Sequence, residues 1–300
     1  MTKYVLAISG GIDSMVLIDL IANNYQGFRT DHFGEAKWPN DFMVAHFDHG
    51  IRGKVSHQDA KFVVKTVQAK YGVPVQVGLG RLSADTSEEM ARQARYNFLR
   101  QTGESAKIVT AHHRDDLLET VVMNLIRGTG WRGLAPMSQP DVVRPLLAWS
   151  KVDIATYALR NNLDWREDQT NYSPKYLRNR LRSALAKCSE ADKCQLADLA
   201  MAQMKLRREI ESELGRYVCK YVIGGNGQWY VRRYDIIMLP DTVALEVLRS
   251  VSRSCLTLPQ LRSLLLFIKV GRPGKRMMWK NVTVQLTKDM VAIGLVRNSH

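Results

Sequence analysis

The chain has 300 residues, 45% of them hydrophobic, which is enough for two domains that each bury a core. Its 43 Lys and Arg outnumber 29 Asp and Glu, giving a formal net charge of +14 that is typical of proteins binding a polyanion. No stretch is apolar enough to cross a membrane, and the N-terminus lacks a signal-peptide pattern. The four cysteines, which form no CxxC pair, disfavour a disulfide framework or zinc knuckle and fit a reducing cytoplasm.

Strand and helix patterns alternate through the first half of the chain. Apolar segments predict strands at 4–8, 42–47, 73–77, 107–111 and 142–146. Helical patterns lie between them at 14–22, 57–71, 86–101 and 114–127, the third opening with a capping box of Thr86 and Glu89. Apolar strands separated by helices predict an α/β fold, a parallel sheet with helices on both faces. In such sheets ligands bind beyond the carboxyl ends of the strands.

The remainder of the chain has a different character. A helix is predicted to begin at Ser150, with Asp153 at capping-box spacing. The charged helical pattern at 184–217 indicates a connector. In the tail we expect strands at 230–237 and 282–286 and helices at 242–251 and 259–270. The segment 29–40, earlier in the chain, is predicted to be an enlarged loop.

Positive charge is unevenly divided between the two parts. The first 185 residues carry 24 Lys and Arg against 19 Asp and Glu, whereas the remaining 115 carry 19 against 10. We place the domain boundary near residue 187. Residues 1–187 would form the nucleotide-binding domain, and 188–300 a helical connector followed by a smaller, basic, mixed α+β domain. The smaller domain is the one expected to hold a nucleic acid.

The first strand runs directly into a glycine-rich turn that opens a helix. This turn is Ser9-Gly10-Gly11-Ile12-Asp13-Ser14. Backbone N–H groups, the positive end of a helix and two hydroxyls suit it to phosphate. It lacks the Lys of a Walker A motif and is too short for a dinucleotide fingerprint. An ordinary strand-to-helix turn with a serine cap is the alternative.

Ionisable residues follow the second strand, in the sequence His46-Phe47-Asp48-His49-Gly50-Ile51-Arg52. Strand alternation points His46 and Asp48 to the same face, with His49 already in the turn. A zinc site would need further Cys or His at ligand spacing, and the sequence supplies none. We therefore prefer a loop that hydrogen-bonds nucleoside and phosphate groups.

Carboxylates follow the fourth strand. Asp116 and Glu119, three residues apart, share one face near the start of a predicted helix. Mg²⁺ takes one or two carboxylates together with phosphate oxygens, and Asp13 can supply a further oxygen. The favourable effect of the helix dipole on carboxylates is the alternative explanation.

Basic residues gather in several places. In the helix predicted at 86–101, Arg92 lies four residues before Tyr96, and Arg95 lies on the neighbouring stripe. Candidate nucleic-acid contacts are Arg127, Arg132, Arg178, Arg182, Arg272, Lys275, Arg276 and Lys280, the last four in a loop that also holds Trp279. A solvated surface is the alternative for each.

Taken in order, these motifs resemble those of the tRNA(Ile)-lysidine synthetase family of PP-loop ATP pyrophosphatases. The matching segments are SGGIDS, HFDHGIR, ARQARYNFL, AHHRDDLLET, RGTGWRGL, RPLL, DQTN and RNRLR, from Ser9 to Arg182. Ile51 replaces a more usual Leu. The resemblance implies an adenine nucleotide alpha hydrolase-like fold and a C–N bond-forming ligase. ATP would adenylate the C2 carbonyl oxygen of the wobble cytidine in an isoleucine tRNA with a CAU anticodon. Free lysine would then displace AMP to give lysidine.

The resemblance also implies roles for individual residues. ATP would be held by Ser9, Gly10, Gly11, Ile12, Asp13, Ser14, His46, Asp48 and His49. Catalysis would use Asp13, Arg92, Asp116 and Glu119. Asp13 and Asp116 would hold Mg²⁺, and the carboxylates as a group would hold Mg²⁺ or the lysine ammonium. A carboxylate or His49 would take the proton from the lysine amine.

Three other interpretations compete. A PP-loop enzyme that thiolates cytidine needs cysteines to carry sulfur, and none precedes Cys188. A non-catalytic nucleotide- or RNA-binding module would not need the acidic residues. A small-molecule amidotransferring ligase would not explain the basic second domain. The oligomeric state, including a homodimer, is left open.

Overall fold

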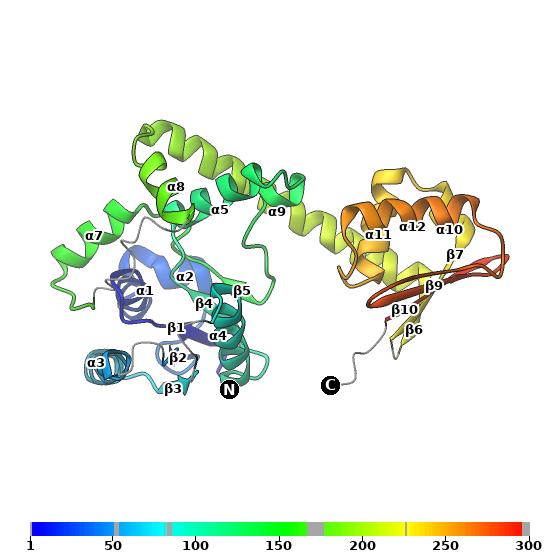
Figure 1. Ribbon diagram of the computed structural model, residues 1–300. Coiled ribbons are helices and arrows are strands. Elements are labelled where there is room, and N and C mark those ends of the chain that lie inside the picture. Colours follow the sequence, from blue (N-terminus) through cyan, green and yellow to red (C-terminus); the bar gives the residue numbers. More distant parts are fainter. Residues whose placement is uncertain are drawn as a thin grey trace. The chain divides into compact units, whose positions relative to one another are not determined.

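The computed structural model describes residues 2–50, 54–80, 82, 86–166, 177–225 and 227–295. The chain divides into two units, Met1–Met204 and Lys205–His300, each with its own sheet (Figure 1). This division falls within the long helix α9 (Glu190–Tyr221), further along the chain than the boundary expected near residue 187. Among the described residues, no helix is long and apolar enough to cross a membrane.

The first unit is built on a parallel sheet with the strand order β3-β2-β1-β4-β5. Its strands are β1 (Tyr4–Ala7), β2 (Phe42–Asp48), β3 (Val75–Leu79), β4 (Lys107–Thr110) and β5 (Val142–Val143). All five predicted strands are confirmed, but β5 is shorter than expected. Pro145 follows almost at once and has no N–H to donate to a ladder.

Helices cover both faces of this sheet, as predicted (Figure 1). The helices of this unit are α1 (Ile12–Ala22), α2 (Phe28–Phe33), α3 (Lys54–Tyr71), α4 (Glu88–Thr102), α5 (Arg114–Ile126), α6 (Trp131–Leu134), α7 (Lys151–Arg160) and α8 (Leu177–Leu185), with a 3-10 turn at Tyr25–Gly27. Side chains of α1, α2, α3 and α7 pack on one face of the sheet. On the other face, Tyr96 and Leu99 of α4 pack against Val5, Ala45 and Ile108.

The two predicted capping boxes had different outcomes. At α7, Ser150 Oγ accepts from the N–H of Asp153 at 3.1 Å, and Asp153 accepts from the N–H of Ser150 at 2.8 Å, which confirms that prediction. At α4 the predicted box is wrong. Ser87 is the N-cap and accepts from the N–H of Met90 at 3.3 Å, because the helix begins one residue later than expected.

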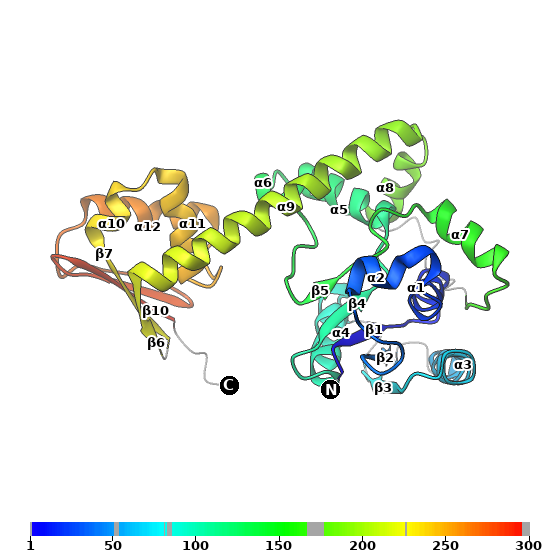
Figure 2. The ribbon, with the colours of Figure 1, turned by 180° about the vertical axis from the view of Figure 1, so that it is seen from behind.

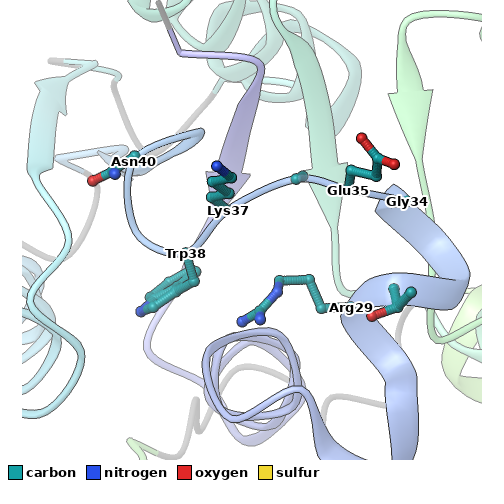
Figure 3. Close-up of a pocket in the computed structure, with 8 residues that line it drawn as sticks. Arg29, Gly34, Glu35, Lys37, Trp38 and Asn40 are labelled. Carbon is teal, nitrogen blue, oxygen red and sulfur yellow. The ribbon is translucent and has the colours of Figure 1, made fainter.

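The enlarged loop predicted at 29–40 is wrong in its first part, where α2 buries Phe28 and Phe33 in the core. The rest curves around an open hollow of about 490 Å³, lined by Arg29, Lys37, Trp38 and their neighbours (Figure 3). Arg29 Nη1 donates to Ile21 O at the end of α1, and Trp38 Nε1 donates to Tyr71 O at the end of α3. Since both helices run back from the carboxyl ends of the strands, this hollow lies at the edge away from the glycine-rich turn from Ser9 to Ser14, which we call the phosphate turn.

The second unit has an antiparallel sheet with the order β6-β7-β10-β9-β8. Its strands are β6 (Val222–Gly225), β7 (Gln228–Arg232), β8 (Arg276–Trp279), β9 (Val282–Leu286) and β10 (Met290–Leu295). Helices α10 (Arg233–Met238), α11 (Asp241–Val251) and α12 (Leu258–Val270) cover one face (Figure 2). The mixed α+β prediction is confirmed. The strand predicted at 230–237 ends at Arg232, where α10 begins, and part of the predicted basic loop forms β8.

One buried carboxylate connects three helices of the first unit. Asp19 on α1 is 2% exposed and accepts hydrogen bonds of 2.8 Å from the hydroxyls of both Tyr71 and Tyr157. Lys70 Nζ lies 3.1 Å from the same carboxylate. A buried carboxylate is stable only when its oxygens are paired, so Asp19 fixes α1 against α3 and α7.

We predict that Tyr157→Phe lowers the free energy of unfolding by about 1–3 kcal/mol, because it removes a hydrogen bond to a charged group. Urea denaturation measures the change. The matched control is Tyr234→Phe, since Tyr234 is 68% exposed and its substitution should leave stability unchanged. Equal stabilities of the two variants would contradict a structural role for Asp19.

Candidate active site

The phosphate turn is held in shape by its own side chains. Gly10 has φ +90°, and a Cβ there would lie 2.9 Å from Val63 Cγ2, so the position requires glycine. Ser14 Oγ accepts from the N–H of Gly10 at 3.1 Å and donates to Gly11 O at 2.8 Å. Ser9 Oγ lies 3.2 Å from Ser14 Oγ. Gly11 caps α1, and Ile12, its first residue, packs against the core.

The polar residues at the end of β2 serve the local structure. His46 is 4% exposed and its Nδ1 lies 2.9 Å from Ile8 O, immediately before the phosphate turn. Burial lowers the pKa of His46, so the ring is neutral and Nδ1–H donates. Asp48 Oδ1 accepts from the N–H of Gly50 at 2.8 Å, and His49 packs edge-on to Phe47. Arg52 lies outside the described residues.

An imidazole at the start of α5 brings acidic groups together. His113 Nε2 lies 3.9 Å from Asp13 Oδ1 and 3.4 Å from Asp116 Oδ2, and its Nδ1 lies 3.5 Å from Asp115 Oδ2. Burial alone would lower the pKa of His113, but the three carboxylates outweigh it and raise that pKa. The neighbouring His113 imidazole lowers the pKa of Asp115 to about 2. We call His113, Asp13, Asp115 and Asp116 the acidic cluster.

The acidic cluster also receives a cation from α7. Lys151 Nζ lies 2.5 Å from Asp13 Oδ1, and the backbone N–H of Lys151 donates to Asp115 Oδ2 at 2.9 Å. Sequence reasoning missed both Lys151 and His113. His113 stood beside the acidic residues in the motif, but Lys151 is 138 positions from Asp13, and no local pattern marks it.

The carboxylates of Asp13 and Asp116 suit a Mg²⁺ ion that is also bound by phosphate, and not a metal ion bound by protein ligands alone. The described residues contain no group of three or more His, Cys, Asp or Glu arranged to hold a metal. Asp13 and Asp116 nevertheless face the same imidazole nitrogen from two helices, and Asp13 already contacts a cation. One or two carboxylates that leave room for phosphate oxygens are a usual protein contribution to a magnesium site.

Glu119 is paired more tightly than the sequence suggested. It is 1% exposed, and its two oxygens accept from Arg178 Nε and Arg182 Nε, each at 2.7 Å. Arg178 Nη2 also donates to Asp116 Oδ1 at 3.3 Å. These two arginines, expected to contact RNA, lie against carboxylates in this structure. Their predicted RNA contacts, and the predicted role of Glu119 in catalysis, remain predictions.

Arginines also gather around Tyr96. The guanidinium groups of Arg92 and Arg95 lie 5.2 and 5.6 Å from the centre of its ring, a cation–π arrangement. Burial lowers the pKa of Arg95 and lowers that of His112 to about 3. His112 is therefore neutral, with Nδ1 2.7 Å from Thr110 Oγ1. Arg92 thus lies in a positively charged region near the end of β4.

The other candidate RNA contacts lie at the surface. Arg127 is exposed at the end of α5, and Arg132 is half-buried with its guanidinium 4.8 Å from the ring centre of Trp131. In the second unit, four basic residues are exposed: Arg272, Lys275, Arg276 and Lys280. The DQTN motif, from Asp168 to Asn171, lies outside the described residues.

We predict that Glu119→Gln lowers the free energy of unfolding by about 2 kcal/mol. The substitution removes the charged partner that Arg178 and Arg182 share, and their partial exposure, together with the contact that Arg178 keeps with Asp116, moderates the cost. Urea denaturation is the measurement. The control is Glu213→Gln, whose carboxylate pairs with Arg216 at the surface, where both side chains are exposed, and should contribute nothing measurable. A stable Glu119→Gln protein would show that the arginines find other partners.

Comparisons with known proteins identify the family that this chain resembles. A family model described as a PP-loop domain matches residues 1–188. A tRNA(Ile)-lysidine synthase of Thermotoga maritima is 30% identical over 303 residues, covering 96% of this chain and 69% of the relative. The Geobacter sulfurreducens enzyme of the same name is 33% identical over 245 residues, covering 74% of this chain and 49% of the relative.

A solved structure shares the fold. It is the U34-tRNA thiolase NcsA from Methanococcus maripaludis with its [4Fe-4S] cluster, with a TM-score of 0.53 and 18% sequence identity. The match covers 68% of this chain and 72% of that one.

Proposed function

This chain belongs to the tRNA(Ile)-lysidine synthase family of PP-loop proteins, and from that membership we propose its reaction. The enzyme is a ligase that uses ATP to join free lysine to C2 of the wobble cytidine in an isoleucine tRNA with a CAU anticodon. One observation carries the proposal. The phosphate turn and the acidic cluster meet at the carboxyl edge of the sheet, in a chain that aligns with a named synthase over 96% of its length.

The proposed reaction has two steps. The C2 carbonyl oxygen of the cytidine attacks the α-phosphorus of ATP, the bond between the α-phosphorus and its bridging oxygen breaks, and pyrophosphate leaves with the bonding electrons. The amine of lysine then attacks C2 and AMP leaves. Adenylation is needed because the carbonyl oxygen is a poor leaving group by itself.

This chain's residues would divide the work between them. The phosphate turn would orient the triphosphate, and Asp13 with Asp116 would hold Mg²⁺, which neutralises phosphate charge when bound. Arg92 would place positive charge near the reacting phosphate or cytosine. The lysine amine must lose a proton before or during attack, and the candidate acceptors are His49 and a carboxylate that does not hold Mg²⁺. Glu119 would bind the ammonium only if Arg178 and Arg182 released it.

Cytidine thiolation is the second candidate, since the thiolase shares the fold. That chemistry calls for cysteines near the nucleotide, yet none precedes Cys188, and all four lie exposed at or beyond that position. A non-catalytic module is also disfavoured, because it would have no use for acidic side chains converging beside the phosphate turn.

The first test measures lysine incorporation into an isoleucine tRNA transcript bearing CAU, with ATP and Mg²⁺. We expect incorporation with pyrophosphate release, and a loss of at least 100-fold in Asp13→Ala, because the site loses a ligand that acts in the transition state. Methionine tRNA, which shares the anticodon, should give none. Pyrophosphate release without lysine incorporation would overturn the choice of nucleophile, and no tRNA-dependent turnover would overturn the proposed function.

A second test addresses the basic second unit. When phosphate contacts contribute to affinity, the logarithm of the association constant falls linearly with the logarithm of the salt concentration. Each lost contact makes the slope of this line shallower by about 1. We expect Arg276→Gln to weaken tRNA binding and to reduce this slope. The control is Lys107→Gln, an exposed residue at the amino end of β4, which should change neither. Identical slopes for both variants would remove Arg276 from the tRNA contacts.

A further inference from the structure

The phosphate turn contains no positive side chain. From Ser9 to Ser14 it holds two glycines, two serines, Ile12 and Asp13, and its only charge is negative. Pyrophosphate is highly charged as it leaves, and its departure is favoured by positive charge placed in advance. In a Walker A loop a lysine within the motif supplies that charge. Here it must come from another part of the chain.

The ammonium of Lys151 is positioned to supply it. Its Nζ contacts Asp13, in the first turn of the helix that the phosphate turn opens. Lys151 is the first residue of α7. The Ser150–Asp153 capping box and the bond from the N–H of Lys151 to Asp115 fix this end of the helix, and the buried bond from Tyr157 to Asp19 fixes its body. The stem of the lysine therefore starts from a rigid point.

The chain beyond α7 returns to the same turn. The N–H of Arg166 donates to Gly10 O at 2.9 Å, and the guanidinium of Arg166 lies 5.1 Å from the ring centre of Phe62. The segment from Lys151 to Arg166 thus contacts the phosphate turn and its first helical turn at two points. These contacts keep the Lys151 side chain close to the phosphate turn, where the triphosphate would bind.

The ion pair between Lys151 and Asp13 is weak enough for each side chain to change its partner. Both side chains are partly exposed, 48% and 31%, and ion pairs in contact with water are weak. Asp13 is also a proposed Mg²⁺ ligand. A divalent cation bound by that carboxylate would compete with the ammonium for it and would leave Lys151 available to the phosphates.

We propose that Lys151 binds the β- and γ-phosphates of ATP and stays with the pyrophosphate as it leaves. Asp13 holds the ammonium in the absence of nucleotide and releases it when Mg²⁺ and nucleotide bind. The bond between the α-phosphorus and its bridging oxygen breaks, the oxygen keeps the electron pair, and the ammonium of Lys151 pairs with it. The inference rests on the proposed function for the identity of the acceptor, but not for binding of pyrophosphate.

The test is calorimetric titration of the full chain with inorganic pyrophosphate and Mg²⁺, and separately with AMP, without tRNA. We expect Lys151→Met to raise the Kd for pyrophosphate about tenfold, as loss of one charge-assisted contact requires, and to leave AMP binding within about twofold. Lys151→Arg should recover most of the pyrophosphate affinity. The control, Arg160→Met, removes one exposed charge from the other end of α7 and should bind pyrophosphate as the wild type does.

A second measurement uses the wild-type protein and does not depend on the variant folding. Pyrophosphate with Mg²⁺ should protect Lys151 from acetylation, read by mass spectrometry, whereas AMP should not. Unchanged pyrophosphate affinity in a folded Lys151→Met protein, equal loss of pyrophosphate and AMP, or absence of protection would each overturn the proposal. Because these assays contain no tRNA, they can succeed where lysine incorporation fails, so the two proposals fail separately.

Discussion

Convergence of carboxylates on one imidazole is the constraint on which the rest of the site depends. Asp13, Asp115 and Asp116 would repel one another if they stood alone, and the raised pKa of His113 reflects how strongly they favour a positive charge between them. Since α1 and α5 follow β1 and β4, which are neighbours in the sheet, their first turns are necessarily close. The parallel sheet thus brings the three carboxylates close together, and His113 and Lys151 offset the repulsion between them.

The strands of the first sheet and the motifs at their ends could be predicted from the sequence, because each depends on residues that are close together in the chain. An apolar run of four or five residues followed by glycine, histidine or aspartate identified β1, β2 and β4 together with the polar groups at their ends. Errors arose where a single residue decides a boundary, as when Ser87 rather than Thr86 caps α4, or where β7 turns into α10 without a break at Arg232.

Partners distant in sequence could not be predicted in this way. Glu119 pairs with arginines about sixty positions away, and Asp13 pairs with Lys151 at more than twice that separation. Composition showed that these charges exist, but only the fold determines which of them meet. The RNRLR motif illustrates the difference, because alternating arginines suggested phosphate contacts, whereas the fold places two of them on a buried carboxylate.

The contacts of Glu119 with α8 determine where this chain can be truncated. The family match ends at residue 188 and includes α8, which carries the arginines that pair with Glu119. Beyond the match, Ala200 and Met204 of α9 pack against Leu117 and Val121 of α5. A fragment that stopped before α8 would lose both arginines that pair with Glu119, and one that stopped before Met204 would expose an apolar surface to water. The shortest autonomous fragment must therefore include the first half of α9, which makes that helix part of the catalytic unit rather than a spacer.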